Sequence, residues 1–164
     1  MGTWHLISAI GALLLGTVVL WSAKGTRFHK TVGLMYVICM SIMLASSFMT
    51  YRLYGYFGLF HYMSVFATLT LLAGMLPLWL KRPRHNYRVW HINFMYWSVM
   101  GLYMAFFSET FTRIPETPFY PMVFAASGLV CVLGVIGHRV YFPKWLERFH
   151  KTQAINHQHN MQKG

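Results

Sequence analysis

Residues 4–51 read WHLISAIGALLLGTVVLWSAKGTRFHKTVGLMYVICMSIMLASSFMTY, two long apolar runs joined by the basic segment KGTRFHK at residues 24–30. A hydrocarbon core about 30 Å thick is crossed by roughly 20 apolar residues in a helix, so each run has the length of one membrane span. The composition of the whole chain also indicates a membrane protein. Of its 164 residues, 56% are hydrophobic and only 10% are charged, whereas about 25% are charged in soluble domains. The stretch therefore predicts a hairpin of two transmembrane helices.

Three further apolar runs follow, so the sequence predicts an all-α integral membrane bundle of five helices, at about 4–22, 31–51, 56–80, 89–107 and 119–141. Residues 1–142 form a single transmembrane domain in this interpretation, and 143–164 form a basic tail. The first run has no basic segment before it, which indicates a retained helix and not a signal peptide. Cys39 and Cys131 fall inside predicted spans, which excludes a disulfide framework.

The cations predict the orientation of the bundle. Twelve of the 14 Lys and Arg residues fall in the first loop, in the third loop, or at and after the end of the fifth run. Positive residues favour the cytoplasmic side, so the N-terminus is predicted outside and the C-terminus in the cytoplasm of a bacterial inner membrane. Only Arg52 and Arg113 lie on the other side. Because the cations cluster beside apolar runs, the net charge of +11 indicates a membrane surface and not nucleic acid.

Histidines fall at two depths in the predicted bundle. His5 and His61 lie at the outer ends of their helices, while His29, His91 and His138 lie at the inner ends. Ionisable residues at membrane depth are costly and tend to serve function. The other four are predicted to be solvated in the third loop and the tail, namely His85, His150, His157 and His159.

An imidazole pair in each layer is what two b-type haems need, because a low-spin haem takes one axial ligand from each side. We predict that His5 and His61 ligate an outer haem iron, and His29 and His91 an inner one, with His138 as a substitute for either inner ligand. Gly33, one turn after His29, leaves room for a porphyrin edge. Lys24 and Arg27 lie where propionates would emerge, although both also serve as topogenic charges that touch anionic lipid.

This hypothesis predicts a haem-dependent membrane oxidoreductase that passes electrons across the membrane, or to and from quinone or another redox partner. One alternative is a cofactor-free subunit or assembly factor of a larger membrane complex, favoured by abundant aromatic residues and few acids. A second is a small transporter with a polar path near Glu109, Arg52 and His61. Homodimer formation stays open. Copper transport is disfavoured, since the methionines of the second run do not form one stripe.

The segment KGTRFHKTVGLMYV, residues 24–37, follows the pattern KGxxxH[KR]xxGxxY. This pattern resembles one that recurs in an uncharacterised domain-of-unknown-function family of small multi-pass bacterial membrane proteins. WHINFMYWSVMGLYMA, residues 90–105, is similar to the second motif of that family. The resemblance implies an integral membrane protein without an established reaction. The arrangement is also similar to the architecture of the cytochrome b561 and superoxide-oxidase group, which carries two haems between its helices; this chain departs from it in having five helices, with the histidines at their ends.

Overall fold

The computed structural model describes residues 2–49, 58–82, 86–112 and 118–161. These residues form helices and contain no strand. The helices are α1 (Thr3–Trp21), α2 (Arg27–Met49), α4 (Leu59–Leu80), α5 (Tyr87–Phe111) and α6 (Phe119–Met161). Each corresponds to one of the five predicted runs, so the all-helical fold class is confirmed.

Four of the helices, α1, α2, α4 and α6, contain segments long and apolar enough to cross a membrane. The chain therefore has the character of a multi-pass membrane protein. The helix outside this group is α5, whose 25 residues include His91, Asn93 and Ser98 as well as several aromatic side chains. With these residues α5 contains no segment as apolar as those of the other four helices.

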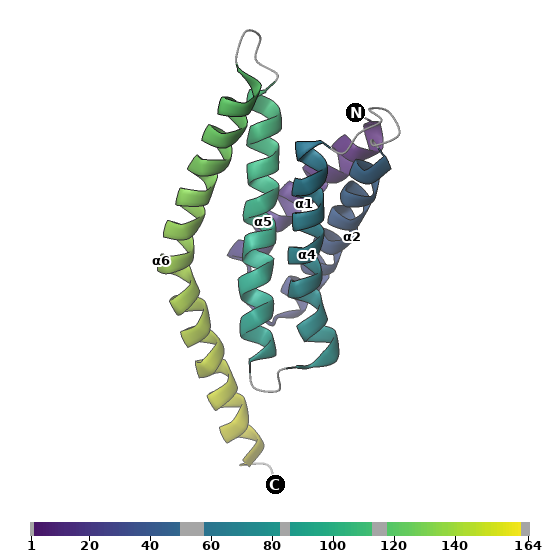
Figure 1. Ribbon diagram of the computed structural model, residues 1–164. Coiled ribbons are helices and arrows are strands. Elements are labelled where there is room, and N and C mark those ends of the chain that lie inside the picture. The colour runs from purple at the N-terminus through teal and green to yellow at the C-terminus, as the bar shows by residue number, and fades with distance from the viewer. Residues whose placement is uncertain (1, 50–57, 83–85, 113–117, 162–164) are drawn as a thin grey trace.

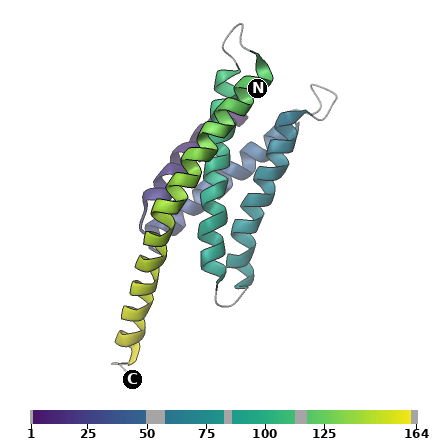
Figure 2. The same cartoon turned by 60° about the vertical axis from the view of Figure 1, so that its left-hand side comes forward.

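The helices are arranged around α5. α1 packs along α2, α4 packs along α5, and α6 packs along the other side of α5 (Figure 1). Contacts of α2 with α4 and of α1 with α5 join the two hairpins. Figure 2 shows that α1 and α2 are tilted relative to the α4 and α5 pair. The α1–α2 connection, the end of α4 and the start of α5 lie together, and we call this the basic end because Lys24, Lys30, Lys81 and Arg88 meet there.

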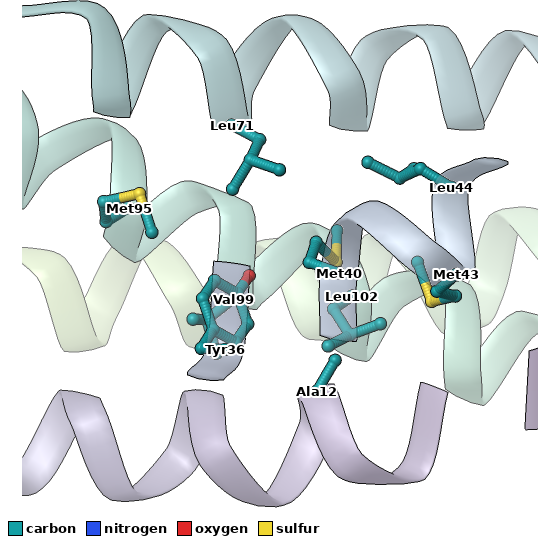
Figure 3. Close-up of a cluster of buried hydrophobic side chains, with 9 residues drawn as sticks. All are labelled: Ala12, Tyr36, Met40, Met43, Leu44, Leu71, Met95, Val99 and Leu102. Carbon is teal, nitrogen blue, oxygen red and sulfur yellow. The ribbon is translucent and has the colours of Figure 1, made fainter. Parts of the chain in front are cut away.

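The core is built from small and flexible side chains where four helices meet. Figure 3 shows side chains from α1, α2, α4 and α5 in one cluster, with Ala12, Tyr36 and Met40 fully buried. A methyl group on Gly16 would lie 3.0 Å from the Tyr36 ring, so glycine lets α1 approach α2 closely. Small residues at such crossings are the usual means by which membrane helices pack.

The last helix is longer than the apolar run that predicts it. The run was expected to end at residue 141, but α6 continues to Met161 and contains Pro143 in its interior. Proline removes one backbone hydrogen bond within a helix, yet it does not end this one. In Figure 1 α6 extends past the ends of α4 and α5 toward the C-terminus. Hydropathy marks where the apolar surface ends, and helical backbone can continue beyond it.

Candidate functional site

A cavity of about 540 Å³ lies at the basic end, between the hairpins. This volume is within the range of small-molecule and cofactor sites, about 300–1,000 Å³. Its lining is mostly apolar and includes Met75, Ile92 and Val99, and His29 of α2 and His91 of α5 also line it. The structure thus brings two of the predicted ligands, and Gly33 with them, to one cavity.

The segment KGTRFHK builds one edge of this cavity. Gly25 has φ +86°, a left-handed conformation that glycine adopts without steric cost. The Thr26 Oγ1 donates to the Ala23 carbonyl at 2.9 Å and accepts the His29 backbone N–H at 3.1 Å, which makes Thr26 the N-cap of α2. His29 is therefore fixed in the first turn of α2 by the backbone that precedes it.

Lys24 closes the end of α1. Its Nζ donates to the carbonyls of Val19 at 2.9 Å and Leu20 at 2.7 Å, both of which belong to the last turn of α1. A cation at a helix C-terminus also interacts favourably with the helix dipole. The same Nζ lies 4.4 Å from the centroid of the Trp145 ring on α6. Burial lowers the pKa of Lys24 from 10.5 to about 8, because it removes water from the ammonium.

The hydrogen bonds of His29 define its tautomer. Its Nδ1 lies 2.9 Å from the Ser22 Oγ. The Ser22 hydroxyl donates its proton to the Val19 carbonyl at 2.9 Å, so it accepts from His29 and Nδ1 must carry the ring proton. The Nε2 of neutral His29 then has a lone pair, which is the form of imidazole that binds a metal.

His91 is held in the same tautomer by a different partner. Its Nδ1 donates to the carbonyl oxygen of Gly74 on α4 at 2.8 Å. A methyl group on Gly74 would lie 2.7 Å from the Met95 Sδ, so this glycine allows the close crossing of α4 and α5 that brings the carbonyl within reach. A ligating histidine commonly donates its second ring N–H to a backbone carbonyl, which fixes the ring and its tautomer.

Two further features of the cavity follow from its lining. A methyl group on Gly33 would meet nothing within 4 Å, so open space lies beside this residue. The charged groups of the lining are Lys24, Lys30, Lys81 and Arg88, and none of its described residues is acidic. Arg27, the other predicted propionate partner, is not among the lining residues. The cavity is thus apolar within, carries two imidazoles and is positive at its rim.

The outer pair, His5 and His61, is positioned differently. His5 donates from Nδ1 to the Ser46 Oγ at 2.9 Å, since that hydroxyl gives its own proton to the Met43 carbonyl. His61 is buried, and its Nδ1 accepts the Gly58 backbone N–H at 3.2 Å. In neutral His61 this bond places the ring proton on Nε2. Neither residue lines either of the two cavities described here.

His138 lies outside the first cavity. Its Nε2 donates to the Asn93 Oδ1 at 2.8 Å, and its ring stacks on Phe142 and on Trp97, with centroids 4.4 Å and 5.9 Å away. His138 thus binds α6 to α5, and the structure brings His91, not His138, to the cavity that His29 lines. Arg52, Arg113, Glu116 and His85 lie outside the described residues. Among those that are described, no group of three or more His, Cys, Asp or Glu side chains could hold a metal ion.

Several residues of this site could not be recognised as functional from the sequence. Ser22 and Gly74 act through hydrogen bonds to His29 and His91, and Trp145 closes the cavity from α6. A serine before a basic loop and a glycine in an apolar run are common in membrane helices. Only the threonine of KGTRFHK, three residues before a histidine, has the spacing of an N-cap. No family model, no curated protein and no solved structure matches this chain.

Proposed function

We propose that this chain is an integral membrane electron-transfer protein that binds one b-type haem in the cavity at the basic end, with His29 and His91 as axial ligands. The observation that supports the proposal is that the two histidines line the same cavity in the same tautomer. They come from two helices, α2 and α5, line one cavity, and each uses Nδ1–H on a protein acceptor, so that Nε2 is the basic nitrogen.

The rest of the cavity fits the same group. Lys30, Lys81 and Arg88 provide cations at the rim for two carboxylates, and Lys24 adds charge although its Nζ is bonded to α1. Met75, Ile92 and Val99 give its lining an apolar surface, which suits a porphyrin ring. A bound haem would supply one-electron redox chemistry. The residues of this chain hold it, neutralise its propionates and set the polarity around it.

We limit the proposal to one haem. His61 uses its Nδ1 lone pair on the backbone of Gly58, so Nε2 bears the proton in this conformation. His5 has the suitable tautomer, but it lines neither of the two cavities described above. The outer pair predicted from depth is therefore left out of the proposed function.

The proposal includes five spans with the basic end in the cytoplasm of a bacterial inner membrane. The polar residues of α5 support a fifth span because several of them make a hydrogen bond within the bundle. His91 bonds to Gly74, Asn93 to His138, and Ser98 to the Tyr36 hydroxyl at 2.9 Å. Polar groups satisfied inside a bundle are tolerated at membrane depth. The orientation rests on the distribution of the cations.

Absorption spectra test the proposal. The full chain is expressed with ample haem, purified in detergent and examined as reduced-minus-oxidised difference spectra. We expect the α band of a b-type haem in the wild type and its loss in His29→Ala and His91→Ala. His138→Ala, which removes a histidine outside the cavity, should keep the band. Added imidazole should restore part of the band in the His91→Ala variant.

Each result bears on one part of the proposal. A wild-type protein without pigment would overturn haem binding. Pigment of equal strength in both alanine variants would overturn the ligand assignment. Circular dichroism of each variant separates loss of haem from loss of the fold.

A cofactor-free membrane subunit is a second candidate, and α6 favours it. This helix packs on α5 and extends past the ends of α4 and α5, as Figure 1 shows. The part of α6 beyond those ends could contact another subunit of a larger complex. A colourless protein that co-purifies with a stable partner, and loses that partner when the chain is cut after residue 148, would support this function over electron transfer.

A further inference from the structure

A second cavity, of about 310 Å³, lies on another side of α5. It is lined by Val89, Trp90, Asn93 and Phe94 of α5 and by Phe142 of α6. The intervening residues His91 and Ile92, and Met95 directly after them, line the first cavity. A single helix therefore separates the two cavities, and both lie at its N-terminal end, where α5 begins at Tyr87.

The polar group of this cavity is Asn93, which is held in one orientation. Its Oδ1 accepts the His138 Nε2–H at 2.8 Å. The His138 ring is in turn stacked on Phe142 and Trp97. With Oδ1 occupied, the Nδ2 amide offers two N–H donors, and neither is bonded to another side chain among the described residues. Asn93 thus lines the cavity and carries amide donors that its bond to His138 does not use.

Three of the other side chains that line this cavity are aromatic rings. Trp90 and Phe94 lie with ring centroids 5.6 Å apart and planes 33° apart, and Phe142 adds a third ring from α6. Aromatic walls favour a planar ring as an occupant, because offset and edge-to-face contacts add to the burial of apolar area. No described lining residue is charged, which disfavours an anionic headgroup.

We propose that this cavity binds the ring of a quinone, with a ring carbonyl accepting a hydrogen bond from the Asn93 amide. The occupant must be planar, uncharged and a hydrogen-bond acceptor, and it must reach the site from the membrane. A lipid chain matches the apolar walls but makes no use of the oriented amide. Trp90 is 49% exposed, so one wall lies open at the surface of the bundle.

The His138 imidazole is the positioning residue for Asn93. It does not line the cavity, but its bond decides which atom of the amide remains for a ligand. Quinone binding itself does not depend on the haem proposal. Electron exchange between the two cavities does rest on that proposed function.

Binding is tested by calorimetric titration of the full chain in detergent with a ubiquinone that carries a single isoprene unit. We expect saturable binding at one site per chain. Asn93→Asp keeps an oxygen for His138 and removes the donor, and Asn93→Leu removes both. Each should weaken binding by about three- to tenfold, the value of one neutral hydrogen bond. His138→Gln keeps an N–H donor to the Oδ1 and should retain more affinity than His138→Ala.

The controls separate this inference from the haem proposal. His29→Ala and His91→Ala lie in the other cavity and should bind the quinone as the wild type does. The inference is overturned if the wild type shows no saturable binding, if both Asn93 variants bind normally while folded, or if an alkylbenzene without carbonyls binds as tightly. A protein that binds quinone but never acquires pigment would overturn the haem proposal alone.

Discussion

His91 donates its Nδ1–H to the carbonyl oxygen of Gly74 at 2.8 Å, across the crossing of α4 and α5. The carbonyl is reachable because the glycine has no side chain to hold the helices apart. The orientation of the histidine therefore depends on how closely two helices pack.

Gly74→Ala tests this dependence. The new methyl would lie 2.7 Å from the Met95 Sδ and 3.1 Å from its Cγ, so Met95 or the helices must move. Overpacking of this kind costs about 1–3 kcal/mol, which exceeds the gain of up to about 1 kcal/mol from replacing a helical glycine. We expect a lower thermal midpoint in detergent and weaker haem retention. Gly101→Ala, where nothing lies within 4 Å, should show neither effect.

Gly33 faces open space beside His29, so the size of its side chain should decide what the cavity can hold. Gly33→Ala should fold and acquire pigment as the wild type does. Gly33→Phe should fold but bind little haem, because the ring occupies the cavity. The ratio of haem absorbance to protein measures both. Full pigment in a folded Gly33→Phe protein would contradict the placement of haem in this cavity.

Stability should depend on pH through Lys24. Burial lowers the pKa in the folded state to about 8, while the unfolded value is 10.5. Between these values the unfolded chain binds more protons, so the free energy of unfolding should rise as pH increases from about 8 to about 10.5. Well below pH 8 Lys24 is protonated in both states, so it adds nothing to the pH dependence of the free energy of unfolding. Unfolding in detergent at several pH values measures it, and Lys24→Met should lower the slope.

The buried bond between the Tyr36 hydroxyl and the Ser98 Oγ, 2.9 Å long, should contribute to joining α2 to α5. Tyr36→Phe and Ser98→Ala should each lower the free energy of unfolding by about 1 kcal/mol. The double variant should cost less than the sum, because the second change removes a group that has already lost its partner. Tyr120→Phe, at a tyrosine that is 63% exposed, is the matched control. Strict additivity would show that the bond contributes nothing.

The sequence predicts the helices of this fold well, because a run of about 20 apolar residues has few other uses. It also predicts that Lys24 and His29 lie at the same end of the bundle as His91. The start of α2 was placed at residue 31, but the helix begins at Arg27, since Thr26 caps it. A basic run in a loop thus conceals the first turn of a helix.

The partners of the histidines could not be predicted in the same way. His91 bonds to a backbone carbonyl 17 residues away, and His138 to an amide 45 residues away. Depth in the membrane places these residues in one layer, but rotation of each helix about its axis decides which cavity a side chain faces. Hydropathy does not report that rotation, so the sequence predicts His91 as an inner ligand but leaves His138 as a substitute for it.

The connection between α1 and α2, residues 22–26, has a consequence for biogenesis. Lys24 and Ser22 bond to carbonyls in the last turn of α1, and Thr26 caps the start of α2, so these three side chains of the connection are satisfied within the hairpin itself. We expect this connection to form without help from the other helices. We therefore expect that the first half of the bundle can insert while the rest of the chain is still being synthesised, with His29 held by Ser22 and Thr26 before α5 brings His91.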